Sequence, residues 1–136
     1  YYFADIGLRN ARLNFRQVEE THIMENIIYN DLIRKGYNVD VGVVEYNQTK
    51  DNKKKKIQLE VDFVVNRGNI RYYIQSALAL NSEEKREQEI NSLKRIDDSF
   101  KKIVVVKDDI IPRYDEQGIY YIGIKDFLLT DNILEN

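Results

Sequence analysis

The chain contains no cysteine, and among its 136 residues it has one proline and one histidine. The absence of cysteine excludes disulfides and thiolate metal sites, and a single histidine excludes a histidine-rich zinc site. No apolar run approaches the roughly 20 residues that cross a bilayer. No GxxxxGK[ST] motif is present, so we expect no Walker A nucleotide site. These absences favour a cytoplasmic domain without a membrane anchor.

The charge balance does not favour a protein that binds DNA strongly on its own. The net charge is −2 and the pI is about 5.5, whereas DNA-binding domains usually carry a basic surplus. Hydrophobic residues make up 43% and charged residues 32%, which is typical of one globular domain. We expect residues 1–16 to form an arm leading in from a preceding domain outside this chain, and residues 17–136 to form the domain itself.

Three segments have helical patterns. Apolar residues recur at helical spacing in residues 18–35, and Gly36 is well suited to end that helix. Asn81 with Glu84 resembles a capping box before a second helix. Asp126 is a candidate cap for a short final helix.

Strand patterns separate these helices. Alternation or apolar character predicts strands at residues 37–44, 57–65, 70–79, 103–106 and 119–124. The polar segment 46–56 is expected to be a loop or a hairpin end. The segment 108–117 is expected to be a loop. The order α-β-β-β-α-β, then β-α, predicts a three-layer α/β/α domain with a mixed central sheet.

The residues most suggestive of chemistry lie in the second predicted strand. Glu60 and Asp62 are two positions apart, so both side chains should leave the same face of an otherwise apolar strand. Two neighbouring carboxylates there need a positive partner or solvent. One interpretation is a salt bridge with solvent access, and the other is a site for a divalent metal.

Two further residues could join this pair. Gln75 lies among apolar residues of the next strand, and pairing across the 66–69 turn would bring it near Asp62. A carboxylate and an amide oxygen are both hard ligands suited to Mg²⁺ or Mn²⁺. Glu25 borders the apolar arc of the first helix, so its carboxylate could point across the sheet toward Asp62. The alternative for Gln75 is a side chain whose hydrogen bonds are made by backbone groups. The alternative for Glu25 is an ordinary glutamate at the boundary of the apolar arc, with its carboxylate turned toward solvent.

Three blocks of sequence carry a resemblance to a known family. They are ETHIMENIIYNDLIRKGYNVDVG, EVDFVV and YYIQSALALNSEEKREQEINSL. In this order and spacing they resemble an uncharacterised C-terminal domain of prokaryotic AAA+ family ATPases, within the PD-(D/E)xK nuclease-like superfamily. The resemblance runs from about Tyr2 to about Leu129. It implies a restriction-endonuclease-like fold and a preceding AAA+ ATPase domain as a partner in the same protein.

The resemblance also assigns a site. Glu25 corresponds to the helix glutamate, Asp62 to the strand aspartate that usually ligates Mg²⁺, and Gln75 to the usual acidic residue. Ala77 stands where the superfamily has its lysine, which helps to orient water and to stabilise phosphorane charge. Glu60 could serve as an auxiliary ligand. Arg86 or Lys85 from the next helix could supply the missing cation.

One further charged segment could contact nucleic acid. Lys53, Lys54, Lys55 and Lys56 form a run in the predicted loop. Such a run is usually a solvated hairpin end, and its functional interpretation is contact with phosphate groups.

These features leave three hypotheses for function. The leading one is a degenerate, non-catalytic nuclease-like module that contacts DNA or a protein. The second is an active Mg²⁺-dependent DNA nuclease that uses Glu25, Asp62 and Gln75. The third is a protein-interaction or homo-oligomerisation domain, which the acidic pI favours over autonomous DNA binding.

Overall fold

Nine helices and strands make up the part of the chain that the structure describes. A computed structural model describes residues 8–80 and 82–131, and it describes side chains from residue 16 onward. The elements are α1 (Leu8–Arg34), β1 (Asn38–Lys50), β2 (Lys53–Arg67), β3 (Ile70–Ala77), α2 (Glu83–Lys94), β4 (Lys101–Val106), β5 (Arg113–Tyr114), β6 (Ile119–Gly123) and α3 (Ile124–Leu129). The predicted order is confirmed, with β5 as an added two-residue strand.

The strands form one mixed sheet in the order β1-β2-β3-β4-β6-β5. The pairs β1–β2, β2–β3 and β5–β6 are antiparallel, whereas β3–β4 and β4–β6 are parallel. The α2 helix makes the crossover between the parallel strands β3 and β4, as a connection of this length requires. The predicted mixed sheet is therefore confirmed.

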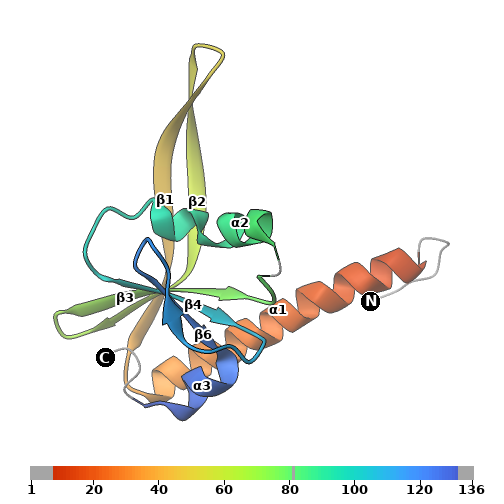
Figure 1. Cartoon of the computed structure of the whole chain (residues 1–136), viewed down its shortest axis with the longest axis vertical. Coiled ribbons are helices and arrows are strands. Elements are labelled where there is room, and N and C mark those ends of the chain that lie inside the picture. Colours follow the sequence, from red (N-terminus) through yellow and green to blue (C-terminus); the bar gives the residue numbers. More distant parts are fainter. Residues whose placement is uncertain (1–7, 81, 132–136) are drawn as a thin grey trace.

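Helices cover both faces of the sheet (Figure 1). One core cluster joins α1 and α3 to the sheet through residues such as Ile28, Ile74 and Phe127. A second joins α2 to the opposite face through residues such as Ile90, Leu93 and Val104. The buried strand predicted at 103–106 packs on both sides, since its successive residues alternate between the two clusters. No helix among the described residues is long and apolar enough to cross a membrane.

Helix α1 begins earlier than the sequence pattern predicts. It starts at Leu8, ten positions before residue 18, so residues 8–16 of the expected arm are helical; residues 1–7 lie outside the described part of the chain. The prediction depended on apolar periodicity, which is weak there. The segment nevertheless contains good helix formers and no glycine or proline after Leu8, which is sufficient to continue a helix.

Of the two alternatives for residues 46–56, a loop or a hairpin end, the structure has the hairpin end, and it is paired almost throughout, so the first two strands are longer than predicted. Lys50 pairs with Lys53 across a two-residue turn, and both turn residues, Asp51 and Asn52, have positive φ (56° and 62°). That geometry matches the hairpin turns whose twist suits antiparallel strands. In Figure 1 this hairpin extends well beyond the body of the sheet. The lysine run is therefore part of a strand.

The helix caps differ from those expected. The cap of α2 is Ser82, whose hydroxyl oxygen accepts a hydrogen bond from the Lys85 backbone N–H at 3.1 Å. Asn81 lies outside the described residues. The cap of α3 is Gly123, without a side-chain hydrogen bond, and Asp126 lies in the first turn. A carboxylate there still interacts favourably with the positive end of the helix dipole.

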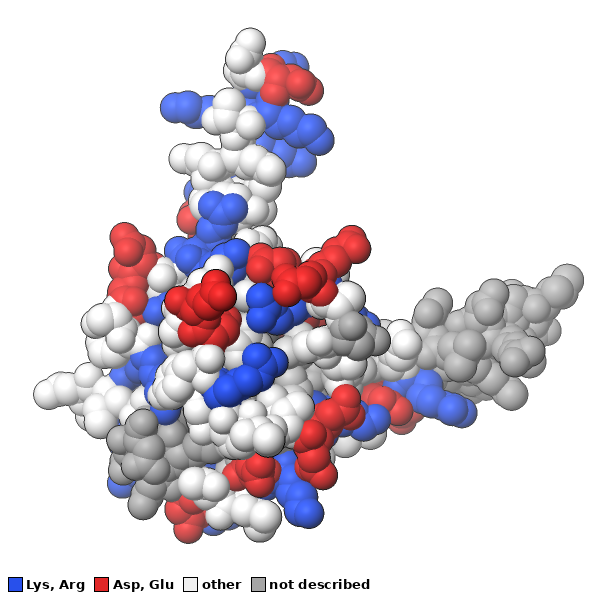
Figure 2. Space-filling model, viewed as in Figure 1, with Lys and Arg blue, Asp and Glu red and all other residues white. Residues whose placement is uncertain are grey.

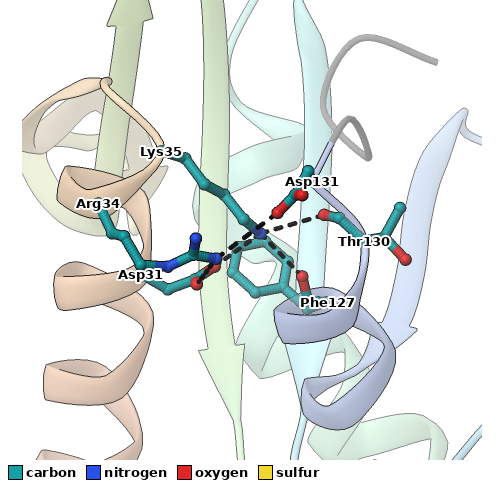
Figure 3. Close-up of polar contacts among 6 residues, drawn as sticks. All are labelled: Asp31, Arg34, Lys35, Phe127, Thr130 and Asp131. Carbon is teal, nitrogen blue, oxygen red and sulfur yellow. Dashed lines mark hydrogen bonds and ion pairs between the residues drawn. The ribbon is translucent and has the colours of Figure 1, made fainter.

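A buried cation joins the end of α1 to the end of α3 (Figure 3). The Lys35 ammonium lies 2.6 Å from Asp31 Oδ2, and it donates to the carbonyl oxygens of Phe127 and Thr130 at 3.0 and 3.1 Å. The Lys35 and Asp31 side chains are 5% and 7% exposed. The two carbonyl oxygens accept hydrogen bonds from the ammonium, and the Asp31 carboxylate balances its charge. Such pairing is the condition under which a buried charge is tolerated.

Candidate functional site

The sheet divides at Asp62. Strand β2 pairs with β3 only from Phe63 to Arg67, whereas β3 continues to Ala77 beside β4. Before Phe63, β2 pairs with β1 alone and forms the projecting hairpin. The gap between β2 and β3 at this point is the fork in which the candidate site lies.

A β-bulge places Asp62 at the fork. Asp40 pairs with Val64 and Gly42 with Val61, so Asp62 and Phe63 together oppose the single residue Val41. The extra residue interrupts the alternation of the strand. Val61 therefore packs on the α2 side, whereas Phe63 and Val65 pack on the α1 side. A strand with unbroken alternation would place all three of these side chains on one face.

Three hydrogen bonds that involve the Asp62 and Gln75 side chains connect β2 to β3 at the fork. The Asp62 backbone N–H donates to Gln75 Oε1 at 3.0 Å. Asp62 Oδ2 accepts from both the backbone N–H and the hydroxyl of Ser76, each at 2.9 Å. These three bonds replace the ladder bonds that β2 and β3 would otherwise make. The predicted proximity of Asp62 and Gln75 is present, and Ser76 is a partner that the sequence did not reveal.

The three residues assigned by resemblance line one cavity. Glu25, Asp62 and Gln75 border a cavity of about 450 Å³, which also touches Ala77 and Lys85. Gln75 occupies the same strand parity as Tyr73 and Ala77, which pack toward α2, whereas Ser76 has the parity of Ile74 on the α1 side. The cavity therefore receives groups from both faces of the sheet.

Glu25 is held in an environment that disfavours its charge. Partial burial raises the pKa of Glu25 above its ordinary value, and the nearby carboxylate of Asp62 raises it further. Glu60 adds a smaller effect of the same sign, and His22, 3.9 Å away, opposes it. Glu25 and Asp62 therefore lie close enough for the charge of one to affect the pKa of the other.

Sequence reasoning missed a further carboxylate, Glu89 on α2. Burial is the largest cause that raises the pKa of Glu89, and Asp62 is the second, whereas Lys85 lowers it. Glu89 lines the same cavity as Lys85 and Asp62. Glu89 is four residues before the buried Leu93, and residues at this spacing share a helix face. This spacing could have indicated that Glu89 faces the sheet. Asp62 thus raises the pKa of one glutamate on α1 and of one on α2.

Three other predicted positions lie elsewhere. Glu60 is exposed on β2 and does not line the cavity. Arg86 faces a different cavity beside Asp115 and Glu116, so of the two cations proposed from α2 only Lys85 borders the fork. The lysine run Lys53–Lys56 lies on the projecting hairpin.

The donor set does not fit a divalent metal as the residues are placed. Among the residues that the structure describes, no three histidine, cysteine, aspartate or glutamate side chains are grouped closely enough to hold an ion. Asp62 Oδ2 already accepts two hydrogen bonds and Gln75 Oε1 accepts one. The Mg²⁺ or Mn²⁺ site at Asp62, Gln75 and Glu25 therefore stays a prediction.

Ala77, which the resemblance places where the nuclease-like superfamily has a lysine, is part of the core. Ala77 is 4% exposed and packs with Tyr73, Ile90 and Val106 on the α2 side. Two cations line the cavity: Lys85, from the first turn of α2, and Lys107, which follows β4.

Comparison with known proteins places the chain in a family. Residues 20–127 match a family model described as "Domain of unknown function (DUF4143)", which is more than half of the chain. The chain belongs to this family. The match fits the predicted uncharacterised, ATPase-associated C-terminal domain, whereas membership of the nuclease-like superfamily stays a prediction.

This DUF4143 domain is also similar to part of a longer protein. An uncharacterized protein of Haemophilus influenzae is 30% identical to it over 133 residues, covering 95% of this chain and 28% of the relative. The chain thus spans about 28% of the length of the curated relative that it matches.

Proposed function

We propose that this DUF4143 domain is a nuclease-like module that contacts nucleic acid without cleaving it, within a protein that also carries an AAA+ ATPase domain. The forked sheet with Glu25, Asp62 and Gln75 at one cavity supports a nuclease-like origin. The resemblance of the sequence blocks supports the ATPase neighbour. A relative much longer than this chain leaves room for such a domain.

The observation that carries the non-cleaving assignment is the closed fork. Phosphodiester cleavage needs an activated water and a cation that stabilises the developing charge. Here the Asp62 carboxylate and the Gln75 amide are engaged in bonds that hold β2 to β3. The lysine position is occupied by the buried Ala77. Residues that would bind metal in a nuclease serve here as structural partners.

Nucleic-acid contact is supported by the position of the lysine run. Lys53–Lys56 are exposed along the projecting hairpin, where several ammonium groups could meet phosphates at once. The test is duplex binding together with plasmid nicking in Mg²⁺ or Mn²⁺. We expect binding that weakens with salt, and nicking by the wild type no faster than by Asp62→Asn, with thermal melts to show that both are folded.

The alternative is an active nuclease in which Lys85 replaces the missing lysine. Its position at the cavity with Asp62 and Glu89 favours this candidate. Metal-dependent nicking that is lost in Asp62→Asn and Lys85→Gln, but kept in Arg86→Gln, would establish it and overturn our proposal. Arg86 is the matched control because it neighbours Lys85 and faces another cavity.

A domain that only contacts protein is the remaining alternative. The edge strand β1 exposes Val41 and Val43, which are 68% and 56% accessible. If the full protein binds no nucleic acid at low salt, this alternative replaces our proposal.

A further inference from the structure

The projecting hairpin is a two-stranded ribbon with a concentrated positive charge. Beyond the pair Tyr46–Ile57, its ladder continues through four further pairs to Lys50–Lys53, and residues 47–56 are all exposed. These ten residues contain five lysines and one aspartate, a net +4. Since the chain as a whole is at −2, the remaining residues sum to −6. Figure 2 shows the basic side chains around the end of the hairpin.

The two faces of the ribbon differ in charge. Directly paired residues of antiparallel strands point to the same face, and successive residues alternate. One face, here called the lysine face, therefore carries Lys50, Lys53 and Lys55 together with Gln48. The other, here called the mixed face, carries Lys54 and Lys56 with Thr49 and Asn47.

The charge of the mixed face is partly neutralised. Lys56 Nζ lies 3.0 Å from Glu45 Oε2, and Gln58 donates to Glu45 Oε1 at 2.8 Å. Hydrogen bonding to Lys56 and Gln58 lowers the pKa of Glu45, as expected for a carboxylate held by a cation. One of the two lysines on the mixed face thus already has an acidic partner.

Positive charge on the lysine face continues toward the body of the domain. Tyr46 follows Gln48 and Lys50 on this face, and the Arg95 guanidinium lies 3.9 Å from the centre of its ring. Arg95 directly follows α2, the helix that covers this side of the sheet. The lysine face therefore extends from the tip of the ribbon to the end of α2.

The dimensions of the ribbon suit a DNA groove. Two paired strands lie about 4.8 Å apart, and the major groove of B-form DNA, about 12 Å wide, admits a two-stranded ribbon. Five residues from Tyr46 to Lys50 extend about 17 Å. The major groove of A-form RNA is too narrow for side chains to enter.

We propose that the lysine face of the β1–β2 ribbon binds duplex DNA along the major groove, with Lys50, Lys53 and Lys55 on phosphates and no dependence on base sequence. The inference rests on the proposed function, because it names the surface and the nucleic acid through which the domain would make contact. The partly neutralised mixed face is directed away from the DNA.

Two double variants of the full protein test the assignment of the face. Lys53→Gln/Lys55→Gln and Lys54→Gln/Lys56→Gln each remove two charges from the same run of four lysines, on opposite faces. Binding to a fluorescein-labelled 20-base-pair duplex is measured by anisotropy between 50 and 200 mM salt. Each lost phosphate contact lowers the slope of log K against log salt by about 0.9.

We expect the lysine-face variant to lose at least tenfold in affinity at 100 mM salt and about 1.8 in slope. The mixed-face variant should lose threefold or less. Equal losses in both variants would overturn the face assignment while leaving nucleic-acid contact intact. Tighter binding of single-stranded DNA or duplex RNA would overturn the duplex-DNA assignment. A wild type that binds no nucleic acid would refute the proposed function itself. Thermal melts confirm that the exposed substitutions leave the fold unchanged.

Discussion

The Lys35 ammonium is the clearest target for a stability measurement. Its side chain is 5% exposed, and its charge is balanced by Asp31 and by two carbonyl oxygens at the end of α3. Lys35→Met keeps much of the aliphatic volume that packs near the Phe127 ring, whose centre lies 4.8 Å from the ammonium. The substitution therefore removes mainly the charge and its three polar contacts.

The expected loss of stability comes from the Asp31 carboxylate, which stays buried after Lys35 is replaced. Removing one partner of a buried ion pair typically costs about 3–5 kcal/mol, because the other charge stays buried. Arg34 still lies 3.0 Å from Asp31 Oδ1 and offsets part of this cost. We therefore expect a loss near the lower end, about 3 kcal/mol.

Urea denaturation at neutral pH measures the change directly. Arg34→Met is the matched control, because it touches the same carboxylate from a side chain that is 60% exposed. An ion pair whose cation is open to solvent contributes little to stability, so we expect a much smaller loss than in Lys35→Met. The double variant Asp31→Leu/Lys35→Met should be less destabilised than the sum of the single variants, because it leaves no buried charge without a partner.

A Lys35→Met variant as stable as Arg34→Met would refute this reasoning. It would mean that water reaches Asp31 and that the connection between α1 and α3 does not depend on the ion pair. Strict additivity in the double variant would lead to the same conclusion.

Two further predictions concern the fork. The pKa of Glu89 is raised in the folded state, so its ionisation lowers stability as pH rises from its ordinary value of 4.5 through the raised value. Glu89→Gln should therefore stabilise the domain in urea titrations at pH 7 and have little effect near pH 3.5; a gain of equal size at both pH values would contradict this. Ser76→Ala removes a 2.9 Å hydrogen bond to Asp62 and should cost about 1–2 kcal/mol. The control is Ser92→Ala, because the buried Ser92 hydroxyl oxygen has no hydrogen-bond partner among the described residues. This variant should keep the free energy of unfolding of the wild type. Equal losses of stability in the two variants would show that the Ser76 bond does not stabilise the fork.

The sequence predicted the layers and the order of elements because both depend on strong local patterns. The helical stripe that contains Met24 and Ile28, and the buried strand at 103–106, are examples. Apolar periodicity could not predict the start of α1 or the length of the hairpin. Residues 8–16 and 46–56 are weakly patterned or polar, and their structure depends on helix propensity and on the turn at Asp51 and Asn52.

The site was only partly predictable. The turn at residues 66–69 places β2 beside β3, so the proximity of Asp62 and Gln75 could be inferred from strand pairing. The bonds from Ser76 to Asp62 could not, because they depend on a bulge that shifts strand parity by one residue. Which α2 cation reaches the cavity also depends on how that helix lies over the fork, and the sequence left both Lys85 and Arg86 as candidates.

The extra residue at Asp62–Phe63 also has a consequence for the orientation of the hairpin. In the inner half of β2 the odd-numbered residues Phe63 and Val65 point toward α1, but in the outer half Val61 points toward α2. Lys53 and Lys55 share the parity of Val61, so they face the same side as α2. If one residue were deleted at the bulge, the hairpin would keep its sequence but present its most basic side on the opposite surface of the molecule. The bulge at the fork thus also determines which surface of the molecule carries the lysine face.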